Sequence, residues 1–219
     1  MNDGIILIDK PAGMTSFGVV ARIRRVLSRQ AGKKVKVGHT GTLDPFATGL
    51  MILTIGKECK NAGNYTKLDK EYEATITLGQ TSSTGDPEGA LTEVSTKEPS
   101  REAVERVLRQ FVGEISQQPP IFSAIKINGQ RAYHLARKGQ EVEIPTRQIT
   151  VYALELLDYT YPEVKIRTHV SSGTYIRSLA VDIGEALGTG AYCRELRRVK
   201  IADWRVEDAK NLSYFGIID

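Results

Sequence analysis

Apolar residues recur along the chain with a helical period in two places. In Phe17–Ser28 and in the stretch that begins at Ser100, apolar side chains lie three and four positions apart, which places them on one face of an α-helix. Thr15 or Ser16 precedes the first stretch and is suited to cap it. A third helix is expected over Thr174–Leu187, which is followed by a glycine stop signal.

Other stretches are short and apolar, or alternate between apolar and polar residues, which is typical of β-strands. They are Gly4–Ile8, Leu50–Ile55, Tyr72–Leu78, Ile149–Leu157, Glu163–Val170 and Val199–Val206, of which the fourth and fifth are expected to pair antiparallel. Strands outnumber helices and do not alternate with them one for one. The sequence therefore predicts a mixed α/β (α+β) fold with a mainly antiparallel sheet, flanked by helices and loops.

The remaining segments predict connections. Residues 79–100 are rich in Gly, Ser, Thr, Pro and acids, and are expected to form an exposed loop. Asn128-Gly129 is a strong signal for a tight turn, and Ala132–Lys138 is expected to form a short helix. No repeat and no linker-like tract interrupts the sequence, so residues 1–219 are expected to form a single domain.

The composition predicts a cytoplasmic protein with no membrane association. Charged residues make up 26% of the chain, and no run reaches the roughly 18 apolar residues of a membrane span. The first residues lack the basic and apolar parts of a secretion signal. Cys59 and Cys193 form no CxxC pair, and the histidines show no ligand spacing with them, so no metal site is expected.

Positive charge is concentrated in two places, within a net charge of +4. Residues 22–36 carry seven basic side chains and no acid, with Arg22 and Arg25 on a helical face that differs from the apolar one. The second cluster consists of Arg194, Arg197, Arg198, Lys200 and Arg205. Either cluster alone is explained as solvated surface, but together they favour binding to a polyanion such as nucleic acid.

Asp44 is the single acid between Lys10 and Thr54, a region that carries eight Lys or Arg residues. It stands in the segment VGHTGTLDPFATGL, residues 37–50, on an expected loop of Gly, Thr and Pro. An Asp-Pro dipeptide is most often a turn. The basic surroundings of Asp44 favour a carboxylate that is placed for chemistry instead.

The segment SSGTYIR, residues 171–177, stands at an expected strand-to-helix junction, where side chains and backbone N–H groups meet at one edge. From there Arg177 would pair with Asp44 and keep it ionised, as a nucleophile requires. Tyr72 and Tyr175 would stack on a base or take part in proton transfer. The alternative interpretation leaves Tyr72 as sheet surface and Arg177 as an ordinary first-turn residue.

The chain has no GxGxxG after a strand, no Walker phosphate loop, no HExxH and no GxSxG, so no cofactor is implied.

Seven segments, taken in order, carry a family resemblance. They are GIILIDKPAGMTS at 4–16, GHTGTLDPFATGLM at 38–51, KEYEA at 70–74, LGQTSSTGDPEG at 78–89, QPPIFSAIKINGQRAYHLARKG at 118–139, SSGTYIRSLAVDIGEALG at 171–188 and LRRVKIADW at 196–204. With them the chain resembles the TruB family of tRNA pseudouridine synthases over its whole length. The GHTGTLDPFATG and SGTYIR pieces are highly specific in combination.

The resemblance implies that Asp44 is the catalytic aspartate, which breaks the glycosidic bond of uridine before the base rotates and rejoins the sugar through C5. It also implies that Tyr72 packs against the target base and takes the C5 proton, and that Arg177 pairs with Asp44. Four further residues are implied to contact the substrate: Lys10, Tyr175 and Leu196 in the uridine pocket, and His39 at the T loop.

The implied substrate is the uridine at position 55 in the T loop of tRNA, which must be flipped out of its loop. Residues 123–147 are implied to be an insertion that grips the RNA. The RNA contacts expected there and elsewhere are Lys126, Arg131, Tyr133, Arg137, Lys138, Arg22, Arg25, Arg197 and Arg198. The resemblance implies no metal, nucleotide or redox cofactor. We expect a monomer with no obligatory protein partner, and a short form without the C-terminal PUA-type domain of many family members.

Two other functions remain open at this point. A non-catalytic RNA-binding module is disfavoured by the intact set of Asp44, Tyr72 and Arg177. A glycoside hydrolase would need two carboxylates roughly 5–10 Å apart. The other candidate acid is Asp86, in the polar segment 79–100.

Overall fold

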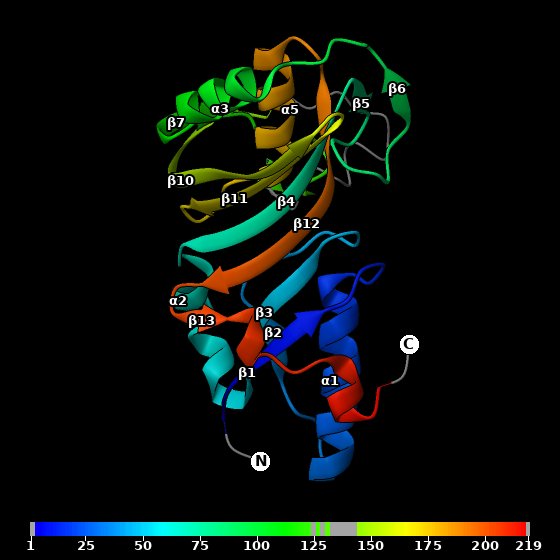
Figure 1. The fold of residues 1–219 in the computed structure, drawn as a ribbon. Helices are drawn as coiled ribbons and strands as arrows, with labels where there is room; N and C mark the ends of the chain where they lie inside the picture. Colours follow the sequence, from blue (N-terminus) through cyan, green and yellow to red (C-terminus); the bar gives the residue numbers. More distant parts are fainter. Residues whose placement is uncertain (1–2, 124–125, 128–129, 132–143, 218–219) are drawn as a thin grey trace. The chain divides into compact units, whose positions relative to one another are not determined.

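The computed structural model describes residues 3–123, 126–127, 130–131 and 144–217 (Figure 1). The chain forms two compact units, one made of Met1–Tyr72 with Leu196–Asp219 and the other of Glu73–Glu195. The chain passes from one unit to the other within two strands, β4 (Lys70–Leu78) and β12 (Ala191–Ile201). The strands form a large, mostly antiparallel sheet, which confirms the predicted fold class.

In the first unit, the central strand β3 has neighbours on both sides. The strands are β1 (Gly4–Lys10), β2 (Val37–His39), β3 (Thr48–Ile55), the end of β12, and β13 (Trp204–Arg205). Strands β1 and β2 pair antiparallel with β3, whereas β12 pairs parallel with β3 at Arg197↔Thr48 and Arg198↔Gly49. A segment late in the chain therefore lies directly beside one near its beginning.

Helix α1 (Ser16–Ala31) packs its apolar face into the first unit and leaves Arg22, Arg25 and Arg29 exposed. The Thr15 hydroxyl caps it by accepting from the Gly18 N–H at 3.0 Å, as the sequence predicts. Gly32 ends the helix in the left-handed conformation, with φ of 62°. Val19, Val20, Ile23 and Leu27 are buried.

The first unit also contains short helical elements. They are a 3-10 helix at Gly56–Lys60, α2 at Ala62–Thr66, and 3-10 helices at Val206–Asp208 and Leu212–Phe215. One buried cluster joins Leu50 and Ile52 of β3 to Ile201 and Val206, with Trp204 packed against it. Burial of this kind, at about 25 cal/mol for each Å² of apolar surface, is the main stabilising contribution.

The second unit is built on the strand order β4-β11-β10-β7. The additional strands are β7 (Gly113–Gln117), β10 (Arg147–Thr160) and β11 (Glu163–Val170), and the pairs β10–β11 and β10–β7 are antiparallel. Two small hairpins complete the unit: β5 (Gln80–Ser82) with β6 (Leu91–Glu93), and β8 (Lys126–Ile127) with β9 (Gln130–Arg131). The predicted antiparallel pair of long strands is confirmed.

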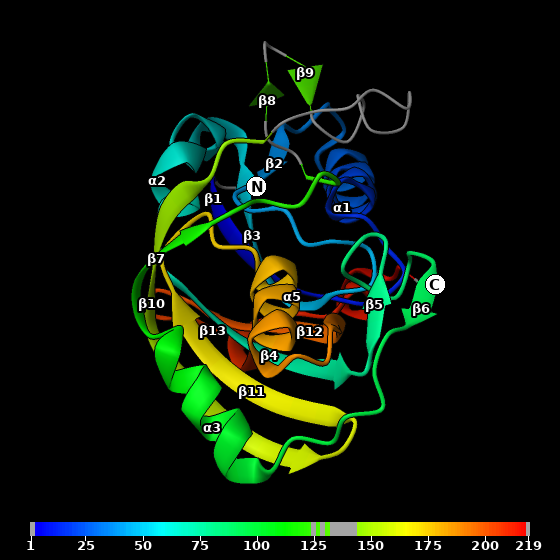
Figure 2. The ribbon, with the colours of Figure 1, turned by 90° about the horizontal axis from the view of Figure 1, so that it is seen from above.

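Two helices of the second unit, α3 (Arg101–Gln110) and α5 (Ile176–Leu187), contact each other, and α3 also packs on β10 (Figures 1 and 2). Ser100 caps α3 by accepting from the Ala103 N–H at 3.3 Å. Helix α5 has no side-chain cap of its own, and it ends at Gly188 in the left-handed conformation.

Three sequence predictions need correction. Residues 79–100 are not simply an exposed loop, because β5 and β6 pair there and Asp86 is buried. Helix α5 begins two residues after Thr174, because Thr174 folds into a turn in which its N–H and hydroxyl both donate to the Ser171 carbonyl. The predicted strand Val199–Val206 is wrong at both ends: β12 begins at Ala191, and the chain turns after Ile201 into β13.

Some predictions fall outside the described residues. The turn at Asn128-Gly129 and the helix at Ala132–Lys138 belong to this group. Among the helices of the described residues, none is long and apolar enough to span a membrane.

Candidate active site

Asp44 lies on the loop between β2 and β3, where its side chain is half-buried. Backbone atoms on both sides of it are held in place. Arg198 Nη2 donates to the Gly41 carbonyl at 3.1 Å, and Lys10 Nζ donates to the Pro45 carbonyl at 3.1 Å. The Ser16 hydroxyl donates to the Leu43 carbonyl at 2.9 Å and accepts from its N–H at 2.8 Å.

Every second residue of the loop is thus anchored, at positions 41, 43 and 45. The Gly13 N–H also donates to the Pro45 carbonyl at 2.8 Å, and the Ala47 N–H donates to the Asp44 carbonyl at 3.2 Å. Leu43 and Ala47 are buried. The backbone around Asp44 is thereby fixed, which limits the positions open to its carboxylate.

Three buried cations lie at this loop or next to it. Lys10 and Arg198 are at most 1% exposed, and Lys70 is 7% exposed. The Arg198 Nε donates to the Leu50 carbonyl at 2.7 Å, so this guanidinium joins the start of the loop to β3. The Lys70 ammonium donates to the carbonyls of Thr66 and Leu68. Buried charge of this kind is costly unless it is well hydrogen-bonded, which the carbonyls provide.

Of two glycines near these cations, Gly41 and Gly49, only Gly49 is required by the close approach of β12. A Cβ on Gly41 would lie 3.4 Å from Arg198 Nη1 and 3.7 Å from Lys70 Cε. Gly49 has φ of 106°, and a Cβ there would lie 2.3 Å from the Arg198 carbonyl oxygen. A Cβ on Gly41 would make ordinary contacts, whereas Gly49 is required for β12 to approach β3 at Arg198.

The pKa of Lys70 is lowered from 10.5 to about 8, first because burial disfavours the ammonium form and then because of the nearby Arg198 charge. Asp69 opposes the shift. Lys70 is a residue that the sequence did not single out.

Other predicted site residues of the first unit are placed on its strands. Tyr72 on β4 and Leu196 on β12 are buried, and His39 at the end of β2 is half-buried. The structure places Lys10, predicted to line the uridine pocket, beneath the loop of Asp44, where its Nζ also donates to the Pro11 carbonyl at 2.8 Å.

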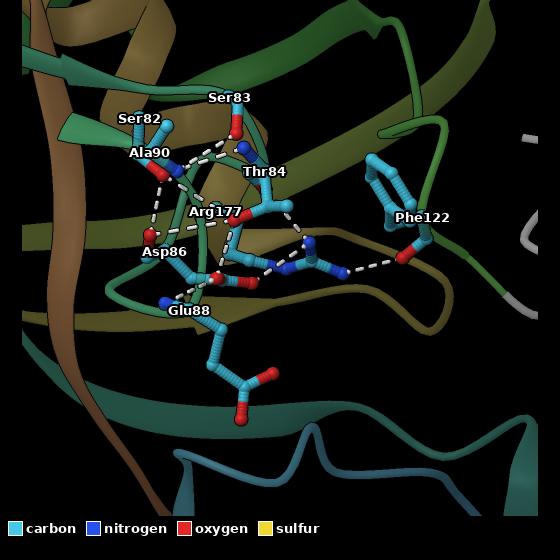
Figure 3. A network of polar contacts seen from close by, with 8 residues as sticks. All are labelled: Ser82, Ser83, Thr84, Asp86, Glu88, Ala90, Phe122 and Arg177. Atoms are coloured by element: carbon cyan, nitrogen blue, oxygen red, sulfur yellow. Dashed lines mark hydrogen bonds and ion pairs between the residues drawn. The ribbon is translucent and has the colours of Figure 1, made fainter. Parts of the chain in front are cut away.

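In the second unit, Arg177 on the first turn of α5 forms a buried ion pair with Asp86 (Figure 3). Arg177 Nη1 lies 3.1 Å from Asp86 Oδ2, and both side chains are at most 5% exposed. The same Nη1 donates to the Thr84 carbonyl at 2.9 Å, and Nη2 donates to the Phe122 carbonyl at 2.8 Å. The guanidinium is thereby held by three separate groups.

The carboxylate of Asp86 is equally well supported (Figure 3). Its Oδ1 accepts from the Thr84 hydroxyl at 2.6 Å and from the Glu88 N–H at 3.0 Å. A buried pair with both members hydrogen-bonded in this way is strongly coupled, because removal of either member leaves an uncompensated charge. Asp86 is therefore a structural partner of Arg177, which removes it as the second carboxylate of a glycoside hydrolase.

Sequence reasoning missed this role of Asp86. The available signal is the pair of glycines around it. Gly85 has φ of 73°, and a Cβ on Gly89 would lie 2.5 Å from the hydroxyls of Ser82 and Thr84. Such spacing indicates a tight turn closed around the carboxylate.

Tyr175 stands at the N-terminal end of α5, where a buried glutamine takes the place of a cap. Gln117 Oε1 accepts from the Tyr175 N–H at 2.8 Å, and its Nε2 donates to the Tyr175 carbonyl at 3.0 Å. Ser178 Oγ donates to the Gln118 carbonyl at 2.8 Å. The SGTYIR segment is therefore fixed by the end of β7.

The predicted RNA-contact residues have different environments. Arg22 and Arg25 are exposed on α1. Arg197 is partly exposed and forms an ion pair with Asp9, with Nη2 2.7 Å from Oδ2. Arg198 is buried, so its placement favours a role in anchoring the loop over contact with RNA. Lys126 of β8 pairs with Arg131 of β9 in the backbone register, and Tyr133 and Arg137 lie outside the described residues.

The two units therefore present an anchored aspartate and an anchored arginine with its counter-ion. Comparison with known proteins gives the class of the chain. Two family models match the chain, and both describe pseudouridylate synthases, which are isomerases. The model of the N-terminal domain of TruB family pseudouridylate synthases matches residues 24–176, and that of the tRNA pseudouridylate synthase B C-terminal domain matches residues 177–215. The chain belongs to the TruB family of pseudouridylate synthases.

Similar curated proteins carry the name tRNA pseudouridine synthase B. The protein from Phocaeicola vulgatus is 46% identical, with 96% of this chain and 91% of that protein covered. The protein from Aquifex aeolicus is also 46% identical, with 97% of this chain and 73% of that protein covered. These relatives agree with the resemblance seen in the sequence.

A solved structure is similar as well. A chain in the crystal structure of a Cbf5-Nop10-Gar1 complex is 32% identical and superposes with a TM-score of 0.74. The match covers 96% of this chain and 52% of that chain, so the present chain spans about half the length of that solved relative. The likeness supports the fold.

Proposed function

We propose that this protein converts uridine to pseudouridine at position 55, in the T loop of tRNA. The observation that carries the proposal is Asp44, held on a loop anchored at Gly41, Leu43 and Pro45, in a chain of the TruB family. The names of the relatives from Phocaeicola vulgatus and Aquifex aeolicus support tRNA as the substrate.

The proposed reaction is an isomerisation in which no atom is gained or lost. The bond between N1 of uracil and C1′ of the ribose breaks, with assistance from the Asp44 carboxylate. The base rotates, C5 forms a new bond to C1′, the proton on C5 leaves, and N1 takes up a proton. Tyr72, which is buried on β4, is the proposed acceptor of the C5 proton.

The remaining residues have binding roles in this proposal. Tyr175 and Leu196 line the uridine pocket, and His39 contacts the T loop. Arg177 keeps Asp44 ionised by pairing with it, and this pairing stays a prediction. Lys10 supports the Asp44 loop from below, since its ammonium binds the Pro45 carbonyl.

RNA binding must offset the cost of flipping the uridine, which is a few kcal/mol. The exposed arginines and lysines of residues 22–36 offer phosphate contacts for this purpose. Residues 123–147 are proposed to grip the RNA as well. The protein is further proposed to act as a monomer in the cytoplasm, without an obligatory protein partner.

The decisive experiment replaces Asp44 by Asn, which keeps the shape of the side chain and removes its charge. Carbodiimide labelling of a T-arm hairpin after incubation would measure pseudouridine, and the rate should fall by roughly a thousandfold or more. Asp203→Asn changes an exposed acid of the same unit and should keep the wild-type rate. An Asp44→Asn protein that is as active as the wild type would overturn the proposal.

A further inference from the structure

A second arginine of the second unit lies against Tyr175. Arg147 is the first residue of β10, and its Cζ is 4.8 Å from the centroid of the Tyr175 ring. The guanidinium also packs on Gly173, where a Cβ would lie 3.3 Å from Nη1 and 3.4 Å from Cζ. The glycine of the SGTYIR segment therefore leaves room for the arginine beside the tyrosine.

A buried guanidinium edge usually binds a carboxylate, but the buried edge of Arg147 binds none within the described residues. Its Nε and Nη2 atoms are buried, and neither has a hydrogen-bond partner within the part of the chain that the structure describes. These two nitrogens form the edge that normally binds a carboxylate as a fork. Burying them without an acceptor is unfavourable, so hydrogen bonding by this edge does not explain why Arg147 lies here. The contact that the structure shows is the one with Tyr175.

The same pair of strands also holds the backbone of Tyr175. Gln117 on β7 pairs with Arg147 on β10 across the sheet. The side chain of Gln117 binds the N–H and the carbonyl of Tyr175, at 2.8 and 3.0 Å. In this cross-strand pair, Gln117 therefore binds the backbone of Tyr175 and Arg147 packs on its ring.

We propose that Arg147 is a positioning residue for the reaction: with Gln117 it fixes the orientation in which the Tyr175 ring meets the uridine. The inference rests on the proposed function, in which Tyr175 lines the uridine pocket. With the backbone fixed by Gln117, the freedom left to Tyr175 is rotation about its side-chain bonds. A planar cation over the ring restricts that rotation and favours a single ring position.

The test is a double-mutant cycle on Arg147 and Tyr175, with a T-arm hairpin as the RNA. Arg147→Met should lower the single-turnover rate by roughly tenfold to a hundredfold, the scale of a misplaced active-site group, and leave the Kd for RNA within about twofold. Arg147→Lys should lose nearly as much, because an ammonium has no plane to lie on the ring. In a Tyr175→Leu background, Arg147→Met should cause no further loss.

Arg101→Met is the matched control, because Arg101 is an exposed arginine of the same unit, paired with Glu105 on α3. It should change neither the rate nor the Kd. Thermal unfolding of each variant separates positioning from stability: a loss of rate at an unchanged Tm supports positioning. If Arg147→Met does not fold, Arg147→Lys carries the test.

Three outcomes would overturn the inference. One is a weaker Kd with a smaller salt dependence at an unchanged rate, which would make Arg147 a phosphate-binding residue. Another is a double variant in which the two losses multiply, since independent residues behave in that way. The third is a Tyr175→Leu protein as fast as the wild type. In that case the inference fails, while inactivity of Asp44→Asn would still support the proposed function.

Discussion

At the scale of single residues, charge inside the protein is held by specific partners. Asp86 and Arg177 form a buried pair in the second unit, and each also binds backbone groups or a hydroxyl. Lys70 in the first unit is held by carbonyls instead, so its charge is buried at a higher electrostatic cost. These two environments lead to different predictions.

Asp86→Asn should destabilise the protein, because it removes the counter-charge of a buried arginine. Loss of one member of a buried pair typically costs about 3 kcal/mol or more. Urea unfolding should therefore show a lower free energy of unfolding, and pseudouridine formation should fall if Arg177 acts in the reaction. Glu105→Gln, which removes the partner of Arg101 in a surface ion pair on α3, should change the unfolding free energy by less than about 0.5 kcal/mol. Equal effects of the two substitutions would contradict a special role for the buried pair.

Lys70 should make stability depend on pH in the alkaline range. Its pKa is about 8 in the folded protein and 10.5 ordinarily, so between these values the unfolded chain binds more protons. The free energy of unfolding contributed by Lys70 therefore rises with pH across this window, by about 3 kcal/mol in total. Below pH 8 the cost of burying the ammonium is fully present.

The measurement compares the wild type with Lys70→Met by urea unfolding at pH 7.5, 8.5 and 9.5. The wild type should gain stability relative to Lys70→Met as the pH rises. Lys67→Met changes an exposed lysine nearby, and the stability of the wild type relative to this variant should not change with pH. A parallel pH dependence of wild type and Lys70→Met would rule out the shifted pKa.

At the scale of elements, the parallel contact of β12 with β3 determines where Arg198 lies. Gly49 permits this contact, because a Cβ there would meet the Arg198 backbone at 2.3–3.0 Å. No side-chain rotation relieves a clash with backbone atoms. The strand pairing and the anchoring of the Asp44 loop thus depend on the same glycine.

Gly49→Ala should therefore lower the free energy of unfolding by several kcal/mol, through the clash and through an unfavourable φ of 106°. Gly63→Ala is the control, because a Cβ on Gly63 of α2 has no atom within 4 Å. That change should be neutral or stabilising by up to about 1 kcal/mol. Chemical denaturation of both variants makes the comparison, and a tolerated Gly49→Ala would contradict the described register.

The sequence predicts elements where the signals are local. Thr15 caps α1, as expected, because the Ncap side chain needs only an N–H two or three residues further along the chain. The helix predicted from Ser100 is α3, which Ser100 caps in the same way. The start of β12 was missed because Arg194, Glu195 and Arg197 interrupt its apolar pattern. Its pairing with distant β3 overrides the local preference.

In the candidate site, too, the sequence predicts what depends on local signals and not what depends on distant contacts. Asp44 was found from its basic surroundings and its motif, both of which are visible in the sequence. The role of Asp86 was missed because it depends on Arg177, which is 91 positions away in the chain and belongs to another element. The burial of Arg198 was missed for the same reason, since its acceptors lie on β3 and the loop before it.

At the scale of the whole molecule, exposed positive charge is gathered on residues 22–36. Arg22, Arg25 and Arg29 are exposed on α1, and Lys33, Lys34 and Lys36 are exposed on the segment that follows it. Such a surface attracts RNA at long range and binds phosphates at short range.

Replacing Arg22 and Arg25 together by Gln should weaken the binding of a T-arm hairpin. The slope of log Kd against log salt concentration should fall by about 0.7–0.9 for each phosphate that the variant no longer binds. The control replaces Arg106 and Arg109, two exposed arginines with the same spacing on α3, and should leave the slope unchanged. Filter binding at several salt concentrations gives both values, and an unchanged slope in the α1 variant would move the RNA surface elsewhere.

The anchoring of the Asp44 loop also orders events during protein synthesis. Arg198 is separated by 157 positions from Gly41 and by 148 from Leu50, the residues whose carbonyls it binds. The ribosome therefore releases the loop long before the strand that anchors it. Contacts between such distant residues form late, because closing a long loop costs entropy. A nascent chain that has not yet reached β12 carries Asp44 on a loop that lacks its Arg198 anchor, so we expect modification of RNA to begin only after β12 has been synthesised.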